Sequence, residues 1–446
     1  MNNILLDLDN ISKVISNIIW PIFIPFLLLI GTYVCAQVFL NIKSLTTNKC
    51  TLNIRHIIPQ TSVALGAMMG TGTIIGFLGA LSKLSASGQL YVEAVALWAL
   101  VGSMVLIPIS YCETLIAKIV GMEPKDYIRK FVSKGASKAY IVAIILLYVM
   151  AIGGVQFSGI DAIMITILEK SAGIYLSEVQ RYLIIVIPII GIVTIIVLKN
   201  RQELFIKSMI TMTLTAAIIY CIFFGMFAYK TANYIPIFIE KMIIGFKNPT
   251  SMLFGIPLGL IFGMQRVIQI AEPGLGTLAL AATKSDSNPR VAATISFILT
   301  STLVVVSIIV TSYIASYGLN EGIINFSAIG IEKLISYFET VIRVTGGLGL
   351  IILFIFIILS GMTTLLGAYF LLNNILKKGN KNKNIIYIIL ISIGGTLAVF
   401  KFDTLFHILD ILLFIATFLN ITALAMFTEF EWSKYKLRNF DIKKLV

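Results

Sequence analysis

Long apolar stretches, interrupted only by short polar segments, follow one another along almost the whole chain. About eleven of them are long enough to cross a bilayer as helices, since about 20 apolar residues span its hydrocarbon core. They lie near residues 18–42, 59–82, 90–118, 139–168, 180–198, 203–229, 251–283, 291–316, 346–376, 384–400 and 404–428. A run such as IIVIPIIGIVTIIVL (184–198) is apolar on every face, whereas the strands of a membrane β-barrel alternate. The pattern predicts an all-α polytopic membrane protein.

Two linkers between spans, residues 233–247 and 323–338, also place apolar residues in a helical rhythm but are too short to span. We expect surface helices there. Structural packing at the membrane interface and an external lid over a substrate path are both open interpretations.

Composition supports a membrane class and excludes several others. The 446 residues are 58% hydrophobic and 12% charged, with a mean hydropathy of +0.97, whereas soluble domains have about 25% charged residues. Cys35, Cys50, Cys112 and Cys221 show no CxxC spacing, and two histidines, His56 and His407, are too few for a zinc or haem site. No phosphate-binding loop, HExxH motif or serine, histidine and acid constellation occurs, so neither an ATP-driven pump nor an enzyme is expected, and no cofactor.

The net charge of +13 reflects topology rather than nucleic-acid binding, because the basic residues lie in short loops between spans. Alternate sides of the membrane carry about 23 and about 10 Lys and Arg residues. The richer side includes Lys125, Arg129, Lys130, Lys134, Lys377, Lys378, Lys381, Lys383 and the basic tail 429–446. We therefore expect the N-terminus outside and the C-terminus in the cytoplasm. The polar and acidic start, MNNILLDLDNIS, does not resemble a cleavable signal.

Two spans contain residues that interrupt a helix. The second span contains GAMMGTGTIIG, in which Gly66, Gly70, Gly72 and Gly76 weaken the helix and Thr71 and Thr73 add hydroxyls. The seventh contains QRVIQIAEPGLGT, where Pro273 removes a backbone donor and Gly274 and Gly276 permit non-helical dihedrals. GxxxG spacings in the second span are also typical of close helix packing alone.

The two interruptions define two halves of the chain. Gly72 and Gly274 are 202 residues apart (274 − 72). After an extra helix at 18–42, each interruption opens a five-span half, 59–229 and 251–428, within a single transporter domain. Because five is odd, the halves insert with opposite orientations and form an inverted repeat. Interrupted helices at matching positions of such halves point to a substrate site at the membrane midplane, as in secondary transporters.

Four segments of the chain resemble the alanine or glycine:cation symporter family. They are PQTSVALGAMMGTGTIIG, YCETLIAK, GGVQ at 153–156, and QRVIQIAEPGLGTLALAATKSDSNP. Matching positions are Gly70, Thr71, Gly72, Ile74, Gly76, Arg266, Glu272, Gly274, Gly276, Ala281 and Ala282. The resemblance covers nearly the whole chain and implies the leucine-transporter type of fold with one additional N-terminal helix.

The resemblance also implies roles for particular residues. Thr71 and Gly72, flanked by Gly70 and Thr73, would hold a substrate carboxylate, Gln156 would line the pocket, and backbone around Gly274 would complete it. SGMTTLLGAY resembles the family segment FTTILGW and places Thr363 and Thr364 at a sodium site beside the first interrupted helix. An interhelical hydrogen bond for Gln156 and capping of their own helix by the threonines are the structural alternatives.

Several positions depart from the family pattern. Thr73 replaces an asparagine, Gln269 a phenylalanine, Ala271 an asparagine and Ala368 a tryptophan. If these positions face the pocket, it should be roomier and more polar than one built for alanine or glycine. In the eighth span Ser301 occupies the position of an aspartate, which bears on cation coupling.

Six ionisable residues fall within or near spans, where charges are costly unless paired or functional: Glu113, Asp161, Arg266, Glu272, His407 and Asp410. Asp410 and Asn420 match family positions in the last span. Two interpretations are open for these residues. One is direct binding of substrate or protons, and the other is a charge network for gating, formed by Glu113, Arg266, Glu272 and Asp410.

The leading hypothesis is sodium-coupled symport of small neutral amino acids across the plasma membrane by alternating access. The expected partners are the amino acid, sodium and the lipid bilayer, and no nucleic acid. Proton coupling through Glu272 or Glu113 and a non-transporting amino-acid sensor are the alternatives. The sequence leaves open which amino acid is carried, the ion and stoichiometry, and the oligomeric state.

Overall fold

The computed structural model describes residues 2–41, 66, 68, 70–198, 202–248, 252–285, 287–328, 330–376 and 382–432, without the side chains of 2–8, 171 and 202–206. These residues are almost all helical. Nine helical stretches among them are long and apolar enough to cross a membrane: Asp9–Asn41, Ala94–Val120, Lys134–Lys170, Glu178–Leu198, Lys207–Lys230, Pro289–Asn320, Glu332–Ile375, Lys383–Phe400 and Phe402–Glu431. The chain is an all-α polytopic membrane protein, as the hydropathy pattern predicts.

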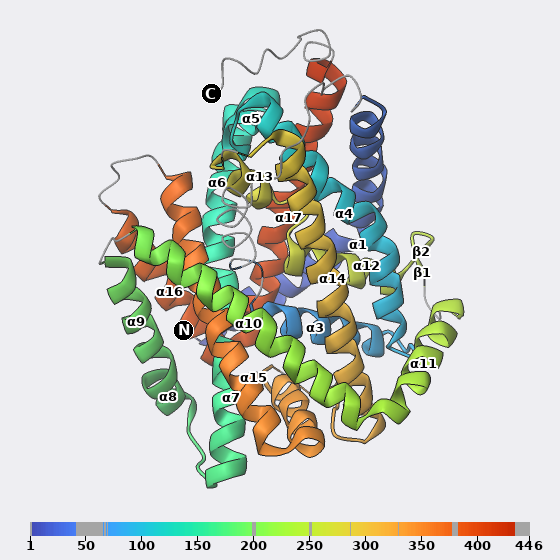
Figure 1. The fold of residues 1–446 in the computed structure, drawn as a ribbon, viewed down its shortest axis with the longest axis vertical. Helices are drawn as coiled ribbons and strands as arrows, with labels where there is room; N and C mark the ends of the chain where they lie inside the picture. Colours follow the sequence, from blue (N-terminus) through green and yellow to red (C-terminus); the bar gives the residue numbers. More distant parts are fainter. Residues whose placement is uncertain are drawn as a thin grey trace.

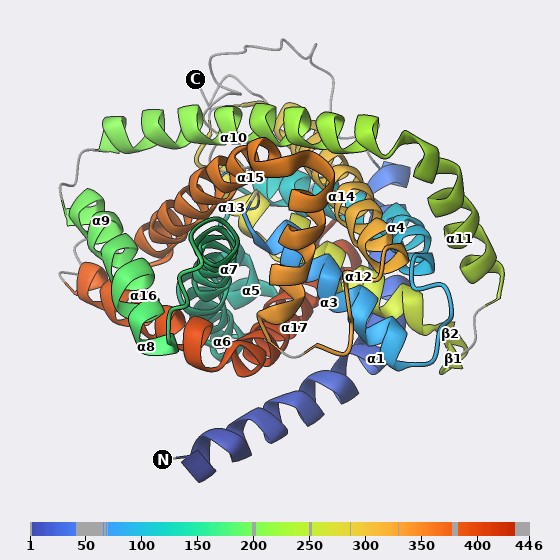
Figure 2. The same cartoon turned by 90° about the horizontal axis from the view of Figure 1, so that it is seen from below.

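The N-terminal helix is longer than the predicted span 18–42. Helix α1 runs from Asn2 to Asn41 and contains Pro21 and Pro25, and its first part projects from the body of the molecule (Figure 2). Among the polar residues before position 18, Ser12 and Ser16 lie buried on one face of the helix. Ser16 donates a hydrogen bond to Asp410 on the last long helix at 3.1 Å.

The next elements end at Lys230. They are α3 (Gly72–Ala86), α4 (Ala94–Val120), α5 (Pro124–Phe131), α6 (Lys134–Ile145), a π-helical stretch (Leu146–Ile152), α7 (Gly153–Ala172), α8 (Glu178–Arg181), a π-helical stretch (Tyr182–Val186), α9 (Ile187–Leu198) and α10 (Gln202–Lys230). The predicted span 139–168 is thus part of one longer helical stretch, α6 to α7, with a wider turn in its middle. Residues 59–65 of the predicted second span lie outside the described residues.

The remaining elements begin with a 3-10 turn (Ala232–Tyr234). They continue as α11 (Ile235–Lys247), the strands β1 (Met252–Leu253) and β2 (Ile256–Pro257), α12 (Leu258–Ala271), α13 (Thr277–Thr283), α14 (Pro289–Asn320), α15 (Glu332–Ile375), α16 (Lys383–Phe400), α17 (Phe402–Met426) and a π-helical turn (Phe427–Glu431). The strands pair antiparallel, with Met252 opposite Pro257. The predicted span 251–283 therefore consists of a short hairpin and two short helices.

The predicted surface helices have different outcomes. Residues 235–247 form α11, which carries exposed Ile237 and Ile243. The predicted helix at 323–338 begins only at Glu332 and continues into the next span, so its predicted bounds are wrong. Gly346, with φ 71° and ψ −168°, kinks α15 at the predicted start of that span, a conformation that glycine adopts without steric cost.

Helices far apart in sequence lie side by side around the middle of the molecule. α3 and α12 pack together, α4 packs against α12 and α14, and α7 packs against α15 and α16. α10 runs along one side of the bundle beside α15, and α11 lies at the periphery (Figures 1 and 2). This arrangement places the two short helices α3 and α12 in the interior.

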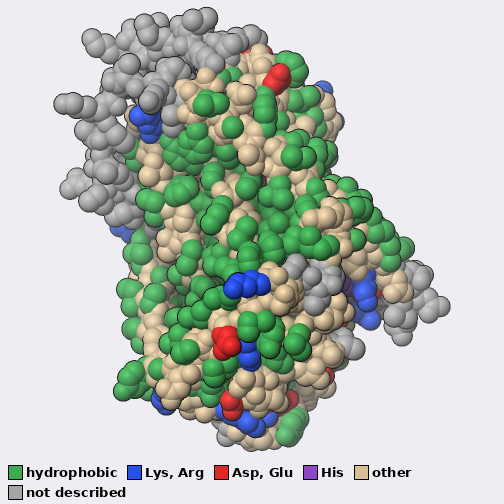
Figure 3. Space-filling view, turned by 90° about the vertical axis from the view of Figure 1, so that its right-hand side faces the viewer, with side chains coloured by type: hydrophobic (Ala, Val, Ile, Leu, Met, Phe, Trp, Pro, Cys, Tyr) green, Lys and Arg blue, Asp and Glu red, His purple; other side chains and the backbone are tan. Residues whose placement is uncertain are grey.

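Apolar side chains cover much of the outer surface. On the face drawn in Figure 3 they extend over most of its height, while charged side chains gather mainly towards its lower part. Large aliphatic residues such as Leu29, Leu40 and Met104 are about three-quarters exposed. Such a surface is suited to lipid contact, because contiguous apolar patches of this extent are rare on soluble monomers.

Candidate functional site: a cavity between two interrupted helices

Thr71 and Gln156, 85 residues apart, meet where α3 begins. Gln156 Oε1 accepts hydrogen bonds from the Thr71 amide at 2.8 Å and from the Thr71 hydroxyl at 2.9 Å. The same hydroxyl lies 3.0 Å from the carbonyl of Val155. Because the first amides of a helix have no acceptor within it, the side chain from α7 satisfies one that would otherwise be unpaired.

Gly70 allows three segments to approach at one point. A Cβ on this residue would lie 2.5 Å from Gln156 Oε1 and 2.7 Å from Thr364 Oγ1, both far closer than real contacts. The chain is not helical at Gly70 and Thr71, and α3 starts at Gly72. The sequence-predicted residues Gly70, Thr71, Gln156 and Thr364 are therefore neighbours.

The second interruption separates α12 from α13. Glu272 follows α12 with a left-handed φ of 58°, and Gly274 and Gly276 have φ of 81° and 86°. Pro273 between them has no amide hydrogen to donate. The chain therefore leaves the helix at Glu272 and resumes it at Thr277.

Side chains from three other helices satisfy the backbone of this interruption. Glu113 of α4 accepts a hydrogen bond from the Gly276 amide at 3.1 Å, and Tyr140 of α6 donates to the Leu275 carbonyl at 2.7 Å. Asn420 of α17 donates to the Gly274 carbonyl at 2.8 Å and to Glu113 at 3.0 Å. The other carboxylate oxygen of Glu113 is buried and has no hydrogen-bond partner among the described residues.

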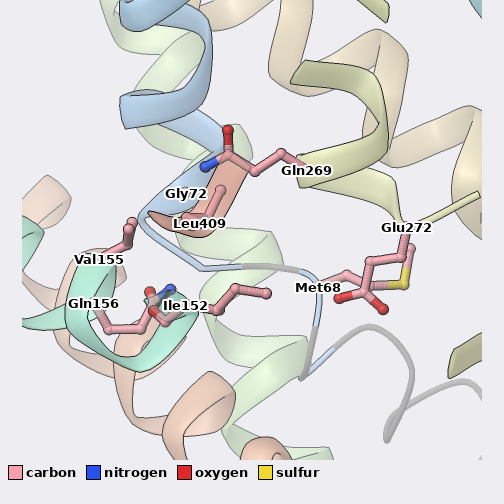
Figure 4. Close-up of a pocket in the computed structure, with 8 residues that line it drawn as sticks. All are labelled: Met68, Gly72, Ile152, Val155, Gln156, Gln269, Glu272 and Leu409. Carbon is pink, nitrogen blue, oxygen red and sulfur yellow. Dashed lines mark hydrogen bonds between the residues drawn. The ribbon is translucent and has the colours of Figure 1, made fainter. Parts of the chain in front are cut away.

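A small cavity lies between the two interruptions (Figure 4). Its walls are Met68, Gly72, Ile152, Val155, Gln156, Gln269, Glu272 and Leu409. Gly72 at the start of α3 and Val155 and Gln156 in the first turn of α7 form one side. Gln269 lies on α12, and Glu272 is the residue directly after α12. The space is tight, with room for about one water molecule. The cavity therefore brings amide and carboxylate groups together in an otherwise apolar interior.

Glu272 is the ionisable residue of the cavity wall. Its Oε2 accepts a hydrogen bond from the Thr277 hydroxyl at 2.6 Å, and no described lysine, arginine or histidine pairs with it. In Figure 4 its carboxylate lies on the side of Met68 and Ile152. A buried carboxylate without a cation is suited to binding a positive group or a proton.

Arg266, one helical turn before Gln269, lies in a buried charge cluster. Its Nη1 and Nη2 donate to the two carboxylate oxygens of Asp410 at 2.9 and 3.0 Å, and both side chains are completely buried. Lys83 lies 3.4 Å from the same carboxylate, and the guanidinium stacks on the Phe406 ring at 4.5 Å. The paired geometry offsets part of the cost of burying these charges.

Arg266 also contacts the cavity wall. Its Nη1 donates a second hydrogen bond to Gln269 Oε1 at 2.6 Å. The charge cluster and the cavity are thus joined through one amide side chain.

Thr363 and Thr364 lie on α15 beside the start of the first interrupted segment. Thr364 Oγ1 is 3.2 Å from the carbonyl of Gly66 and 3.0 Å from that of Ser360, and Thr363 Oγ1 is 2.8 Å from the Ser360 carbonyl. Both hydroxyls thus donate to a carbonyl of their own helix, α15, and the Thr364 hydroxyl also contacts the carbonyl of Gly66 in the segment before α3. The oxygens that gather here are of the type that a hard monovalent cation binds.

Some predicted residues lie away from the cavity wall. Thr73 is buried and donates to the Gly70 carbonyl at 2.8 Å, while Gly274 and Ala368 are buried but do not line the cavity. Ser301 donates to the carbonyl of Phe297 on its own helix at 2.7 Å. The structure thus brings Gly72, Gln156 and Gln269 to one cavity and leaves Ala368 outside it.

Other residues singled out from the sequence have partners elsewhere. Asp161 lies 3.5 Å from Arg181, and His407 Nδ1 lies 3.3 Å from Asp9. The sulfur atoms of Cys35 and Cys112 are 3.7 Å apart, in free cysteines. Cys50, His56, Lys377, Lys378 and Lys381 lie outside the described residues.

Sequence reasoning missed the apolar walls and one hydroxyl. Met68, Ile152, Val155 and Leu409 line the cavity, and only the nearness of the first three to the glycine motifs gave a signal. Thr213 of α10 has a buried hydroxyl without a partner among the described residues, and a Cβ on Gly66 would lie 3.0 Å from it. A single threonine in an apolar span carries no signal of this kind.

No model of a known protein family matches the chain, and no curated protein matches it. The fold and cavity define a polytopic helical membrane protein with a buried polar cavity between two interrupted helices. Its function is therefore inferred from the contacts described above.

Proposed function

We propose that the protein is a secondary active transporter that couples the movement of small neutral amino acids to sodium by alternating access. The observation that carries the proposal is the cavity itself, which has the N-terminal end of α3 at Gly72 on one wall and the carboxylate of Glu272 on another. Positive helix ends favour a carboxylate, and Glu272 favours an ammonium group. The two features together suit a zwitterion.

The helix packing supports an inverted repeat of two five-span halves, 59–229 and 251–428, after the extra helix α1. In such a repeat the equivalent pairs are α3 with α12, α4 with α14, and α7 with α15. Each of these three pairs is in direct contact. Contact between equivalent helices is expected near a twofold pseudo-symmetry axis, and the two interrupted helices, α3 and α12, form one of the pairs. The nine long apolar helical stretches of the described residues, together with the short helices α3 and α12, would account for the eleven predicted spans.

Sodium would bind where Thr363 and Thr364 meet the segment before α3. The Gly66 carbonyl and the Thr364 hydroxyl already approach within 3.2 Å, and Thr213 adds a third hydroxyl beside Gly66. Because this segment continues to Gly70 and Thr71, a cation there would stabilise the geometry that holds the substrate carboxylate. Coupling then follows from a shared backbone segment.

Substrate entry requires the cavity to widen, since even a small amino acid is larger than one water molecule. Met68 and Leu409 are the flexible apolar walls that would move. The cluster of Arg266, Asp410 and Lys83 joins α3, α12 and α17, so it would act as a gate that breaks or shifts as the halves rock.

By its motifs the chain would be a divergent member of the alanine or glycine:cation symporter family, in the plasma membrane with its N-terminus outside and its C-terminus in the cytoplasm. Of the positions that diverge from the family pattern, Gln269 lines the cavity and adds to its polar character.

Uptake by the purified protein in liposomes tests the proposal. Labelled alanine, glycine, serine and larger neutral amino acids would be offered under an inward sodium gradient, an inward proton gradient, or neither. We expect accumulation that needs sodium. Folded protein that neither accumulates nor binds any of these amino acids would contradict the proposal.

Proton coupling is the second candidate, favoured by Glu113 and Glu272. Both are buried carboxylates that no described basic side chain pairs with, and each contacts the interruption after α12. Accumulation driven by a proton gradient without sodium would select this alternative. Binding without accumulation under any gradient would indicate an amino-acid sensor.

A further inference from the structure

The orientation of the Gln269 amide is fixed by its neighbour. Gln269 Oε1 lies 2.6 Å from Nη1 of Arg266. An arginine side chain has donors only, so the atom of Gln269 that faces it must be the carbonyl oxygen. The amide nitrogen of Gln269 therefore points to the other side.

That other side is the cavity. Gln269 is one of its walls, and in Figure 4 the nitrogen of its amide lies on the Gly72 side while the oxygen points away. This nitrogen donates no hydrogen bond to any residue in the described part of the chain. The cavity thus contains a fixed donor with an unused hydrogen.

The charges around the cavity restrict what this donor can bind. Arg266 donates hydrogen bonds to both carboxylate oxygens of Asp410. The carboxylate largely compensates the positive charge of Arg266, so this charge contributes little to the electrostatic potential in the cavity. Glu272 on the same wall disfavours a second anionic group beside the substrate's own carboxylate, which we assign to the start of α3. The suitable ligand group is a neutral acceptor, such as a hydroxyl or amide oxygen.

We propose that Gln269 determines specificity by donating a hydrogen bond to the side-chain oxygen of the substrate, so that the transporter prefers small neutral amino acids with a hydroxyl or amide, such as serine, over apolar ones. This inference rests on the proposed function. A site with a fixed buried donor disfavours a ligand without an acceptor, because the donor is then left unpaired.

Serine and 2-aminobutyrate provide the test, since they differ only in a hydroxyl in place of a methyl group. Competition of each with labelled alanine, in uptake and in binding to the purified protein, gives a preference ratio. We expect the wild type to prefer serine by roughly tenfold. Gln269→Met, which keeps length and removes both polar atoms, should abolish that preference.

Gln265→Met is the matched control. Gln265 lies one turn earlier on α12, is completely buried and does not line the cavity, and its two polar atoms have no partners among the described residues. Its replacement should leave the ratio unchanged. Gln269→Glu keeps an oxygen for Arg266 but has no amide hydrogens, so it separates a supporting role towards Arg266 from donation to the substrate: we expect the ratio to fall here too.

Two results would overturn the inference without overturning the proposed function. One is equal competition by serine and 2-aminobutyrate in the wild type while alanine binds, which leaves the proposed transport function standing. The other is a serine preference that survives in Gln269→Met. Failure of folded protein to bind any of the three amino acids would overturn the proposed function and this inference together.

Discussion

The side-chain oxygen of Gln156 accepts two hydrogen bonds from Thr71, one from the backbone amide at 2.8 Å and one from the hydroxyl at 2.9 Å. This pair fixes the start of α3 against α7 at the edge of the cavity. The amide hydrogens of Gln156 point back to the Ile152 carbonyl at 3.1 Å, so the orientation of its amide is determined by both ends. A change in Gln156 therefore alters the geometry of the segment to which we assign the substrate carboxylate.

Gln156→Ala should weaken amino-acid binding by about tenfold or more. It leaves the Thr71 amide buried without its acceptor, a loss of about 1–3 kcal/mol. Thr71→Val should have a smaller effect, because the hydrogen bond from the backbone amide of residue 71 to Gln156 Oε1 remains. Affinity is measured as the half-saturating concentration for uptake and for thermal stabilisation of the purified protein.

Thr166→Val is the matched control for this pair. Thr166 is a buried threonine of α7 whose hydroxyl bonds the Ala162 carbonyl of its own helix at 2.8 Å. It should bind amino acids normally. Unchanged affinity in both Gln156→Ala and Thr71→Val would remove the two residues from the substrate site.

The glycine-rich motif predicts the interruption at Gly70 and Thr71, whereas Gln156 and Thr364 were placed beside it only by the resemblance to the symporter family. Gly70 is needed where three segments come within contact distance, and Pro273 and Gly276 mark the second interruption. The contact of Arg266 with Gln269 and Asp410 was not predictable, since it depends on how α12 and α17 pack. Leu409 likewise carries no signal, because an apolar wall residue looks like any other apolar residue of a span.

Asp410→Asn should destabilise the protein more than Arg266→Met. Removing the carboxylate leaves Arg266, which is completely buried, without an anion, and breaking a buried pair in this way costs about 3–5 kcal/mol. Removing Arg266 leaves Asp410 with Lys83 at 3.4 Å and the Ser16 hydroxyl at 3.1 Å. The midpoints of thermal unfolding in detergent measure the difference.

The double variant Arg266→Met with Asp410→Leu is expected to recover part of the loss, because no unpaired charge of the pair remains. Equal destabilisation by the two single variants would mean that Lys83 does not compensate for Arg266. That result would contradict the three-residue cluster as the structure has it.

Thr364→Val should raise the sodium concentration for half-maximal uptake by about tenfold, because it removes a hydroxyl that we assign to the proposed sodium site. Thr364→Ser should retain sodium affinity, since the hydroxyl remains. Thr422→Val of α17, whose hydroxyl bonds the Phe418 carbonyl at 2.7 Å, is the control for loss of a helix-capping hydroxyl. Normal sodium dependence in Thr364→Val would exclude this hydroxyl as a ligand.

Ala368→Trp should lower stability rather than narrow the substrate range. The symporter family that the chain resembles has a tryptophan at this position, but Ala368 is only 1% exposed and does not line the cavity. An indole added to a close-packed interior costs about 1–3 kcal/mol through displaced neighbours. A stable variant that accepts glycine and alanine but rejects larger amino acids would instead place Ala368 at the substrate.

Most of the fold could be predicted from the period and length of the apolar runs, as at 384–400, where α16 spans Lys383–Phe400. The bounds failed where a helix continues through polar residues. In α1, Ser12 and Ser16 are buried by packing, and in α15 only Gly346 bends a helix that starts at Glu332. The hydropathy pattern contains no information about such tertiary contacts, so it predicts that a helix ends where the apolar run ends.

A charge contact outside the spans gives a pH-dependent contribution to stability. Glu123, between α4 and α5, pairs with Lys125 at 2.9 Å and accepts a hydrogen bond from Lys284, just after α13. Burial raises the pKa of Glu123, but the hydrogen bonds from Lys284 and Lys125 outweigh it, and the pKa lies below its ordinary value of 4.5. The contact therefore favours the ionised carboxylate in the folded protein.

The sign of the effect follows from this lowered pKa. The folded state gains stability from Glu123 above the pKa of the unfolded chain, near 4.5, and loses it as the pH falls through the lower pKa of the folded state. Because Lys284 is 42% exposed, we expect a contribution of about 1 kcal/mol or less. Unfolding midpoints of wild type and Glu123→Gln should differ at pH 7 and converge towards pH 3. A difference that stays constant over this range would mean that the carboxylate charge is not what joins α13 to the start of α5.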